Sequence, residues 1–427
     1  MPRELKRVVI TGIGAVTPIG IGKDRLWEGV RRGRSAGGAV TRFDASPLKS
    51  HIAAQIEDFD AANYLDAKSA RRFDRFSCFS VAASKMALDD ARLSIDRQDG
   101  DRVGAYIGTA LGGVSNAERE HETFVQEGFR GVNRLIALSV FSGAGALNVS
   151  IALGLKGPSL SNANSCSSGT IAVGEAFRLI QHGQADVMLA GGAEAPLSPL
   201  CFGAFDLIGA MSSRNDEPGR ASRPFDAGRD GFVMAEGAAV MVLEEREQAI
   251  RRDAPIYGEL VGYGLTSDAH SMTIPRPDGS QAARAMRLAL EESGLAAEDI
   301  DYINAHGSST PLNDKTETLA IKTVFGEAAR RIPISATKAM HGHALGASGA
   351  IEVAIGLLAM QNGWIPPTIN LDQPDPECDL DYVPKEGRAA SARRMMTQSF
   401  GFGGSNAALV IAGTAGEGVP SPQTGNR

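Results

Sequence analysis

The sequence predicts an α/β protein built from two related halves. Short runs rich in β-branched residues alternate with longer Ala- and Leu-rich segments along the whole chain, as in sheets covered by helices. In addition, three stretches of the first half recur in the same order in the second half. A length of 427 residues exceeds that of a typical single domain, so we expect two cores or one large fused core.

The individual elements follow from local patterns. Apolar residues at three- and four-residue spacing indicate helices packed on a sheet, whereas short β-branched runs indicate buried strands. The strands are expected over 7–14, 102–110, 185–192 and 239–245, and two of the helices over 79–91 and 169–183.

The repeat pairs segments of similar character rather than of high identity. Each pair joins the same kinds of element: a helix end and strand, a strand with a polar loop and small-residue helix, and a Gly-broken turn with a terminal strand. The pairs are 87–110 with 289–309, 157–183 with 332–363, and 230–245 with 399–413. We therefore expect an N-terminal half over 1–254 and a C-terminal half over 255–413. The polar, Pro- and Gly-containing segment 414–427 is expected to be a mobile tail.

Composition excludes several classes of protein. The formal net charge of −7 argues against nucleic-acid binding. No apolar run is long enough for a membrane span, and the apolar N-terminal stretch is broken by Gly and Pro, which favours a first strand over a signal peptide. The four cysteines lie far apart, with neither disulfide nor zinc spacing. We expect a cytoplasmic protein.

Cys166 is the candidate nucleophile. It lies in NANSCSSGTIAV, where a polar loop turns into a helix of small residues, and a thiol at a helix N-terminus gains thiolate character from the helix dipole. The alternative is a small buried side chain, a common place for free cysteine. Cys78, Cys201 and Cys378 lack such surroundings and are interpreted as structural.

Two histidines lie in turns that could meet this cysteine. His306 follows an expected strand in YINAHGSSTP, at the sheet edge where ligands bind in α/β proteins. His343, in KAMHGHALGASGA, lies at the loop-to-helix junction that the repeat pairs with Cys166. Either could be a hydrogen-bonded core histidine, but together with Cys166 they read as a nucleophile with two imidazoles. His341 and His343 are two residues apart without a carboxylate at ligand spacing, so we expect no metal site.

The Gly-rich run SFGFGGSNAALVIAG is the third candidate feature. It lacks the G-K-[ST] ending of a phosphate loop and precedes a strand, so it is not interpreted as one. A Gly-rich reversal exposes backbone N–H groups and suits an oxyanion hole, although a plain tight turn explains the same residues.

These motifs together resemble a known family. SNANSCSSG, INAHGSSTPLNDKTE, KAMHGHALGASGAIE and QSFGFGGSN occur in the order and spacing of the β-ketoacyl-acyl-carrier-protein synthases, and residues 211–245 are similar to the elongating synthase II group of bacterial type II fatty-acid synthesis. The resemblance covers about residues 5 to 412. It implies a thiolase-like fold, with duplicated halves forming a five-layer α-β-α-β-α sandwich, and a homodimer.

The resemblance also implies roles for the central residues. Cys166 would carry the acyl chain as a thioester, and the N–H groups of Cys166 and Phe402 would form the oxyanion hole. His306 and His343 would stabilise the enolate that forms when malonyl-carrier protein loses carbon dioxide, and Lys338 matches the active-site lysine. This would be a decarboxylative condensation that gives a 3-oxoacyl-carrier protein, an acyltransferase reaction.

The accessory residues carried over from the family form four groups. Phe402 matches the gatekeeper, with Phe400 and Leu111 near the acyl pocket. The pantetheine-binding group is Thr273, Ser308 and Thr310; the charge network around Lys338 is Asp314, Glu317 and Glu352; the docking site for acyl carrier protein is Lys68, Arg71, Arg72 and Arg214. No cofactor is required because the substrates carry phosphopantetheine; a structural monovalent cation is an additional expectation.

Two departures and several alternatives accompany this interpretation. His341 replaces the small or hydroxyl residue usual two positions before the catalytic histidine, and NANSCSSG differs from the usual nucleophile loop. The alternatives are a freestanding ketosynthase of a polyketide or specialised acyl pathway, and a non-catalytic chain-length partner, which would lack the cysteine. A thiolase is disfavoured because Cys378 lies outside any catalytic-looking turn, and an initiating synthase because His343 occupies the position of its asparagine.

Overall fold

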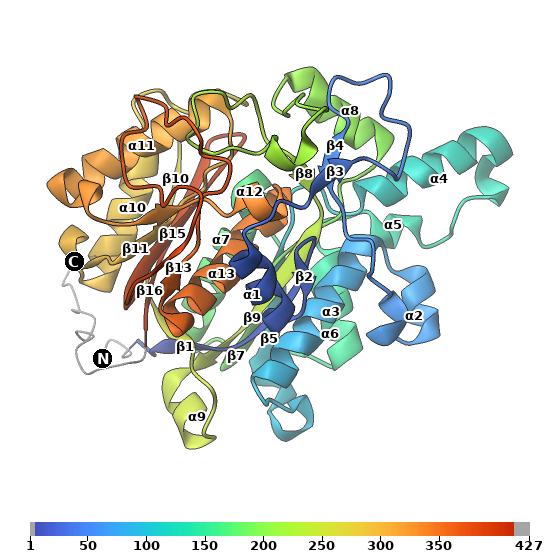
Figure 1. Ribbon diagram of the computed structural model, residues 1–427. Helices are drawn as coiled ribbons and strands as arrows, with labels where there is room; N and C mark the ends of the chain where they lie inside the picture. Colours follow the sequence, from blue (N-terminus) through green and yellow to red (C-terminus); the bar gives the residue numbers. More distant parts are fainter. Residues whose placement is uncertain (1–4, 414–427) are drawn as a thin grey trace.

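The N-terminal half contains a five-stranded sheet. The structure, a computed structural model, describes residues 5–413, so the expected tail 414–427 lies outside the described residues (Figure 1). The strands lie in the order β1-β9-β7-β5-β6, where β1, β9 and β7 are antiparallel neighbours and β7, β5 and β6 are parallel. Their bounds are β1 Val8–Thr17, β5 Val103–Gly108, β6 Ser159–Leu160, β7 Val187–Glu194 and β9 Gly237–Glu245.

The C-terminal half repeats this sheet. Its order is β10-β16-β15-β11-β12, with the same antiparallel and parallel neighbours at the corresponding places. The bounds are β10 Gly258–Ser267, β11 Tyr302–Asn304, β12 Ile334–Ser335, β15 Arg394–Gly401 and β16 Ser405–Ala412. A short antiparallel pairing of β1 with β10 over Val8–Ile10 joins the two sheets. The duplication expected from the sequence repeat is therefore confirmed.

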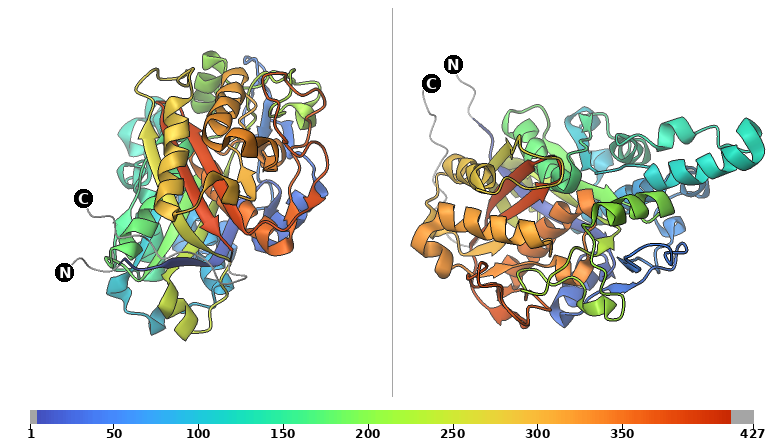
Figure 2. Two further views of the ribbon diagram at one scale, coloured as in Figure 1. Left: turned by 90° about the vertical axis from the view of Figure 1, so that its left-hand side faces the viewer. Right: turned by 90° about the horizontal axis from the view of Figure 1, so that it is seen from above.

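Helices cover both sheets and fill the space between them. In the N-terminal half, α3 (Arg75–Asp90) and α6 (Ala144–Leu153) pack on the outer face; in the C-terminal half, α10 (Ser280–Ser293) and α11 (Pro311–Phe325) do so. The helices α7 (Ser168–Gln181) and α13 (Ser348–Asn362) pack on each other between the sheets (Figures 1 and 2). This is the expected five-layer α-β-α-β-α arrangement.

The remaining elements lie on the loops and edges. The short strands β3, β4 and β8 form a separate small sheet, and β13 pairs with β14. The short strands are β2 Gly20–Ile21, β3 Gly37–Ala39, β4 Ile52–Ala54, β8 Met234–Ala235, β13 Trp364–Ile365 and β14 Arg388–Ala389. The remaining helices are α1 Lys23–Arg32, α2 Ala67–Arg72, α4 Val114–Glu127, α5 Ile136–Ser139, α8 Pro199–Ile208, α9 Arg246–Arg251 and α12 Lys338–His341. The 3-10 turns are η1 Ala61–Asn63, η2 Ile95–Arg97, η3 Gly100–Arg102, η4 Gly128–Arg130, η5 Ser165–Ser167, η6 Pro218–Arg220, η7 Ala297–Asp299, η8 Gly326–Arg330 and η9 Leu345–Ala347. Between residues 5 and 413, no helix is long and apolar enough to cross a membrane.

The predicted elements are present, with shifted ends. The strand expected over 7–14 continues to Thr17, and the helix expected over 79–91 begins at Arg75. The earlier start has a local cause, because the Asp74 carboxylate accepts a hydrogen bond from the N–H of Phe76 and caps the helix.

Glycines let each outer helix lie directly on its sheet. A Cβ at Gly12 or Gly14 would lie 2.1 or 1.9 Å from a carbonyl oxygen of α3, and a Cβ at Gly262 or Gly264 would lie 2.0 or 1.9 Å from a carbonyl oxygen of α10. Both strands shift register at the first glycine of each pair. The duplication thus extends to the close contacts that hold each helix on its sheet, and the sequence repeat had not included these two segments.

We expect Gly264→Ala to destabilise the protein strongly. The added methyl would overlap the Ala285 carbonyl oxygen in α10, and backbone cannot move aside without displacing the helix, so the loss should be about 3 kcal/mol or more. Gly38→Ala in β3 is the matched control, because nothing lies within 4 Å of a Cβ there. Urea unfolding of both variants measures the difference; equal midpoints would contradict this account of the packing.

Candidate active site

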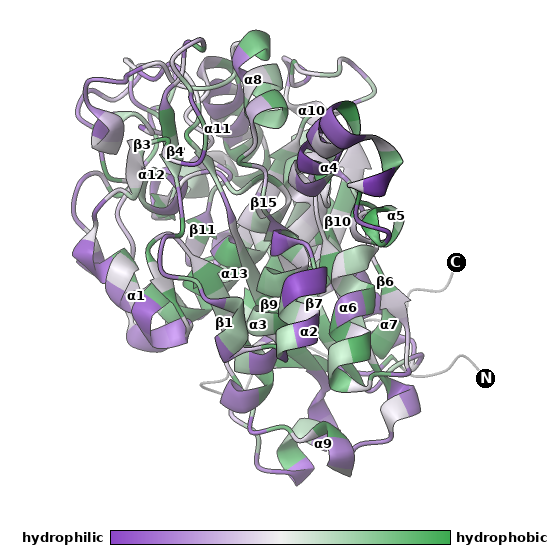
Figure 3. Ribbon diagram, turned by 90° about the vertical axis from the view of Figure 1, so that its right-hand side faces the viewer, coloured by the Kyte–Doolittle hydropathy of each residue, from purple (hydrophilic) through white to green (hydrophobic). Residues whose placement is uncertain are grey.

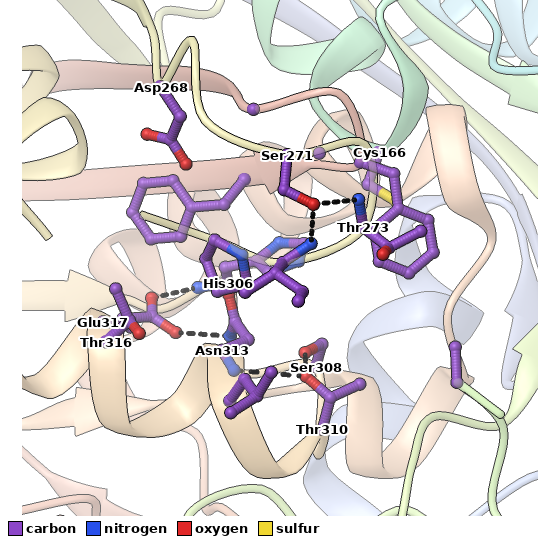
Figure 4. A pocket seen from close by; sticks show the side chains of 18 of the residues that line it. Cys166, Asp268, Ser271, Thr273, His306, Ser308, Thr310, Asn313, Thr316 and Glu317 are labelled. Carbon is purple, nitrogen blue, oxygen red and sulfur yellow. Dashed lines mark hydrogen bonds between the residues drawn. The ribbon is translucent and has the colours of Figure 1, made fainter. Parts of the chain in front are cut away.

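One cavity of about 450 Å³ collects most of the candidate residues. Its walls come from the two halves of the chain: Cys166 from the start of α7, His306 from the end of β11, and His343 from the turn before α13. The loop after β10, the first residues of α11 and the β15–β16 turn complete the lining. Figure 4 shows Cys166 and His306 in this pocket, with the hydroxyl-bearing Thr273, Ser308 and Thr310 around it.

Cys166 lies in the 3-10 turn η5 that leads into α7. The preceding residue, Ser165, has a φ of 54°, a left-handed conformation that a side chain adopts at a cost of about 1 kcal/mol or more. Burial raises the pKa of the Cys166 thiol, although the Ser165 hydroxyl, the Lys338 ammonium and the Phe402 N–H favour the thiolate. The thiol is therefore protonated at rest and depends on a neighbour that accepts its proton.

The second half contains the same turn at η9. Leu345 has a φ of 41° and occupies the place of Ser165, so Gly346 corresponds to Cys166. The two loop-to-helix junctions therefore correspond, and within them His343 lies three residues before the equivalent of Cys166. His343 reaches the thiol because η5 and η9 are in contact, which places the residues just before η9 beside Cys166.

His343 is the nearest base to the thiol. Its Nε2 lies 3.1 Å from Cys166 Sγ, and its Nδ1 lies 2.8 Å from the Ser348 hydroxyl. The backbone fixes the residue, because the His343 N–H donates to Val233 and its carbonyl accepts from Ala235. A hydroxyl can donate or accept, so Ser348 leaves both neutral tautomers of this imidazole available.

Lys338 orients the other imidazole. Its Nζ lies 3.3 Å from His306 Nδ1, donates to the His306 carbonyl oxygen at 2.6 Å, and forms a buried ion pair with Glu352. An ammonium can only donate, so His306 Nδ1 is the acceptor and its proton lies on Nε2. The His306 and His343 rings meet edge to face, with centroids 5.5 Å apart.

The predicted charge network is only partly present. Asp314, Glu317 and Glu352 are all fully buried, but only Glu352 pairs with Lys338. Asp314 instead lies 3.6 Å from Arg229 and accepts from the N–H of Phe225. Glu317 accepts from the N–H groups of His306 and Gly307, at 2.7 and 2.8 Å, and so holds the backbone of the histidine turn. Helix spacing places these carboxylates together but does not reveal which backbone donors reach them first.

The imidazoles stay neutral. Burial, followed by the charge of Lys338, holds the pKa of His306 and of His343 well below the ordinary histidine value. His341 is also fully buried, and burial lowers its pKa to about 3; its Nε2 lies 3.1 Å from the Thr337 hydroxyl. His341 lies two residues before His343, as expected, but it does not line the cavity.

The β15–β16 turn brings a backbone donor to the sulfur. The Phe402 N–H donates toward the Cys166 thiol, and a Cβ on Gly401 would lie 3.2 Å from the Cys166 nitrogen, a tight contact that glycine avoids. Phe402 stacks on Phe205, with centroids 6.3 Å apart, and Phe400 packs on His306. The turn thus brings one of the two N–H groups expected for an oxyanion hole, that of Phe402, to the thiol.

The apolar wall beside the thiol includes residues that the sequence did not indicate. Leu111 packs into the cluster that contains Cys166 and Phe402, as expected of an acyl-pocket residue, although it does not line the cavity itself. Phe205 and Phe232 belong to the same cluster and were not anticipated. Phe205 lies in no motif, Phe232 lies in the 211–245 stretch without being singled out there, and the fold brings both to the thiol.

The expected pantetheine residues lie along the way out. Ser308 and Thr310 line the cavity with their hydroxyls 3.0 Å apart, and Thr273 lines it from the exposed loop after β10. Exposed apolar side chains, Met272 and Leu312, stand beside them.

The expected docking residues do not share one surface. Lys68, Arg71 and Arg72 lie exposed on α2, which is far from α8 and α11 beside the cavity (Figure 1). Arg214 follows α8 and pairs with Glu217 at 3.4 Å. A single chain therefore offers the α2 cations and Arg214 as separate sites.

Three buried side chains near the histidine turn, one of them the partner of Lys338, carry oxygens without a hydrogen-bond partner. Asn304, Glu352 and Gln398 each keep one buried side-chain oxygen without a hydrogen-bond partner, and the Asn304 amide donates to the Glu352 carbonyl. Oxygen atoms of this kind fit a hard cation. Over residues 5–413, no group of three or more His, Cys, Asp and Glu side chains is placed to hold a metal ion.

Comparison with known families identifies the class. Residues 5–249 match the family described as Beta-ketoacyl synthase, N-terminal domain, and residues 257–372 match Beta-ketoacyl synthase, C-terminal domain. Together the two matches cover most of the chain. The protein belongs to the β-ketoacyl synthase family and is an enzyme of the acyltransferase class.

Named relatives are similar over their whole length. The chain is 48% identical to 3-oxoacyl-[acyl-carrier-protein] synthase 2 of Synechocystis sp., over 96% of this chain and 98% of the relative. It is 44% identical to the protein of the same name from Coxiella burnetii, over 96% and 99%, and 43% identical to that from Staphylococcus aureus, over 95% and 98%.

Solved structures share the fold. A β-ketoacyl synthase from Burkholderia phymatum superposes with a TM-score of 0.89 at 40% identity, and the ishigamide ketosynthase/chain length factor with 0.89 at 34%. A type II polyketide ketosynthase in complex with its acyl-carrier protein gives 0.88 at 35%. Each match covers 96% of this chain and 100% of the other.

We expect His306 and His343 to remain neutral across the physiological pH range. Their pKa values are lowered, so protonation begins only well below the ordinary histidine value. In ¹⁵N-resolved NMR spectra of the imidazoles, the two side chains should show unchanged neutral-form shifts from about pH 8 down to about pH 5.5. Assignment by His306→Gln and His343→Gln identifies the signals. A midpoint near 6.5 for either ring would contradict the electrostatic picture given above.

Proposed function

We propose that the protein is an elongating 3-oxoacyl-[acyl-carrier-protein] synthase of the type 2 class, working in fatty-acid elongation. It joins a Cys166-bound acyl chain to a malonyl group and releases 3-oxoacyl-carrier protein, carbon dioxide and free carrier protein. The observation that carries the proposal is the meeting of one thiol, two neutral imidazoles and one ammonium in a single pocket. Identity to 3-oxoacyl-[acyl-carrier-protein] synthase 2 relatives over nearly the whole chain supports it.

Acylation starts at the Cys166 thiol. His343 Nε2 accepts the thiol proton across 3.1 Å, and Sγ attacks the carbonyl carbon of the acyl thioester. The N–H groups of Cys166 and Phe402 receive the charge that develops on the carbonyl oxygen. The bond from the carbonyl carbon to the pantetheine sulfur then breaks, and that sulfur takes the proton from His343. Free carrier protein leaves with its thiol restored.

Condensation uses the two imidazoles as donors. When the malonyl carboxylate leaves as carbon dioxide, the electron pair of the broken C–C bond forms an enolate. His306 donates from Nε2 because Lys338 occupies its Nδ1, and His343 donates from Nε2 when Ser348 donates to its Nδ1. The enolate carbon attacks the Cys166 thioester, a new C–C bond forms and the C–S bond breaks. The Cys166 thiolate finally takes a proton from solvent.

Lys338 and the buried carboxylates contribute by holding His306 and its turn in place. Lys338 sets the tautomer of His306, and Glu317 holds the two N–H groups of the histidine turn. A monovalent cation, when bound, would be held by Asn304, Glu352 and Gln398 and would supply positive charge to their unpartnered oxygens. No step of the reaction passes through it.

A homodimer explains the position of the docking residues. The edge strand β6 ends the N-terminal sheet, and apolar side chains stand exposed next to it on α5, α6 and β6, including Leu138 and Ile151, which are 63% and 74% exposed. Pairing of two copies through this surface would bury that area. We propose that in this dimer α2 of one subunit lies beside the pocket of the other, so that the acidic carrier protein contacts both subunits.

A freestanding polyketide ketosynthase is the second candidate. The ishigamide and type II polyketide structures share the fold at 34% and 35% identity, which favours keeping this alternative. A non-catalytic chain-length partner fits less well, because Cys166, His306, His343 and Lys338 are all present and in contact. The acyl chains that load Cys166 separate the first two: saturated fatty chains support elongation, and poly-oxo chains support the alternative.

We expect Cys166→Ala to abolish acylation. Without Sγ no thioester can form, so intact-mass spectrometry after incubation with acyl-carrier proteins of several chain lengths should show no added acyl mass. Cys201→Ala is the matched control, since Cys201 is equally buried but lies in α8, next in sequence to Phe202 of the apolar cluster; it should acylate like the wild type. Acyl mass persisting on Cys166→Ala would reject the nucleophile assignment.

Cys166→Gln should separate the half-reactions. Its amide fills the place of the acyl thioester without reacting, while both imidazoles keep their partners. Malonyl-carrier protein should then be decarboxylated to acetyl-carrier protein, above the wild-type rate and without condensation, as measured by gel shift or mass spectrometry. Loss of decarboxylation would show that the cysteine, rather than the histidines, drives loss of carbon dioxide.

Charge reversal on α2 should weaken carrier binding selectively. In Lys68→Glu/Arg71→Glu, the KM for acyl-carrier protein should rise about tenfold or more, because the exposed cations that attract the acidic carrier are lost. Acylation by a short acyl thioester without carrier protein should not change. Arg251→Glu, an exposed arginine on the distant α9, is the control. Figure 3 shows α2 as a hydrophilic helix at the surface. An unchanged KM in the α2 variant would remove it from the docking site.

A further inference from the structure

Glu194 is a fully buried carboxylate that the reaction steps above do not use. It ends β7 in the segment AGGAEAP, close to the thiol turn, and neither the motifs nor the spacing indicated it. Burial raises its pKa to about 7 in spite of four hydrogen bonds. A carboxylate placed at such a cost beside the reacting thiol requires a physical role.

The four donors to Glu194 come from both halves of the chain. One carboxylate oxygen, Oε2, accepts from the N–H of Ala110 at 2.5 Å and from the N–H of Gly346 at 3.0 Å. The other, Oε1, accepts from the hydroxyl of Thr109 at 2.9 Å and from the N–H of Leu111 at 3.2 Å. The side chain thus joins the loop after β5 to the η9 turn that follows His343.

The groups that Glu194 binds at both ends of this bridge lie close to the thiol. Leu111 packs in the apolar cluster that holds Cys166 and Phe402. Gly346 occupies the place in η9 that Cys166 occupies in η5, and a Cβ there would lie 2.7 Å from Glu194 Oε2 and 2.3 Å from the Ala110 nitrogen. The missing side chain at Gly346 is therefore what lets the carboxylate reach across.

We propose that Glu194 is a positioning residue that sets the acyl-chain specificity of the enzyme by holding Leu111, in the apolar cluster beside Cys166, against the turn of the C-terminal half. This inference rests on the proposed function. Glu194 touches no reacting atom and acts through the backbone of Ala110 and Leu111.

Glutamine at position 194 tests this bridge selectively. If the amide oxygen takes the place of Oε2, the N–H groups of Ala110 and Gly346 keep their acceptor. The amide nitrogen then replaces Oε1, where Thr109 can rotate to accept but the Leu111 N–H faces another donor. In the reverse orientation the amide nitrogen would face the N–H groups of Ala110 and Gly346, so two buried donors would lose their acceptor, which is less favourable. Glu194→Gln therefore loosens Leu111 while retaining the turn after His343.

The experiment compares long and short acyl primers. Acylation of Cys166 is timed by intact-mass spectrometry with dodecanoyl- and with butyryl-carrier protein, and malonyl decarboxylation is measured alongside. In Glu194→Gln, the dodecanoyl-to-butyryl rate ratio should fall about tenfold, the size of effect expected from one unpaired buried donor, while decarboxylation stays within about twofold of wild type. The ratio is the readout because altered reactivity of the thiol would change both primers equally.

Two further variants separate positioning from general damage. Glu244→Gln replaces another fully buried glutamate, which is bonded to Thr11 and Arg252. Glu244 lies near the end of β9, whereas Glu194 pairs with Gly237 at the start of that strand, so this variant should leave the ratio unchanged. Leu111→Ala removes the side chain that Glu194 is proposed to position, and adding Glu194→Gln to it should give no further change in the ratio. Thr109→Val, which keeps the carboxylate, should lower the ratio less than Glu194→Gln does and serves if the latter fails to fold.

The outcomes are distinct. A proportional loss with both primers, an additive effect in the double variant, or an unchanged ratio in Thr109→Val together with Glu194→Gln would overturn the role assigned to Glu194. Failure of the wild-type protein to accept either primer would instead reject the proposed function.

Discussion

The site depends on one buried ammonium. Lys338 is almost fully buried and lies among three acceptors: the Nδ1 and the carbonyl oxygen of His306, and the Glu352 carboxylate. These partners compensate for the loss of water around the charge. They also fix where the proton of His306 lies, because an ammonium cannot accept. The same contacts tie α12 to the end of β11 and to α13, so the tautomer of the imidazole and the packing of three elements have a common cause.

The duplicated architecture explains why the reacting groups meet. In both halves, glycines in the first strand let an outer helix lie on the backbone of the sheet, and a left-handed residue starts the central helix. The N-terminal ends of the two central helices, α7 and α13, lie next to each other, because the turns η5 and η9 that precede them are in contact. The halves differ in what they put there: a thiol in the first, and in the second a glycine that leaves room for the Glu194 carboxylate.

Much of this could be predicted from local pattern. The strand runs, the small-residue helices and the order of repeated segments predict two similar halves, and Cys166, His306 and His343 stand out because each lies in a Gly- or Ser-rich turn beside an apolar element. Local sequence patterns did not predict the contacts of side chains whose partners lie far away in the sequence. Asp314 and Glu317 were expected in the charge network of Lys338. In the structure, Asp314 instead pairs with Arg229, and Glu317 accepts a hydrogen bond from the backbone N–H of His306. Phe205 and Glu194 lie in no motif, and Phe232 lies in the 211–245 stretch without being singled out by any pattern.

By itself, the sequence determined which chemical groups the enzyme has and the type of element that carries each, because helix and strand periods and turn residues act over a few neighbours. Only the tertiary structure decided which groups touch. The 3.1 Å separation of His343 and Cys166, the choice of Glu352 as the partner of Lys338, and the bridge from Glu194 to Gly346 all cross between distant segments. Their geometry follows from close packing of two sheets and their helices, which no short stretch of sequence encodes.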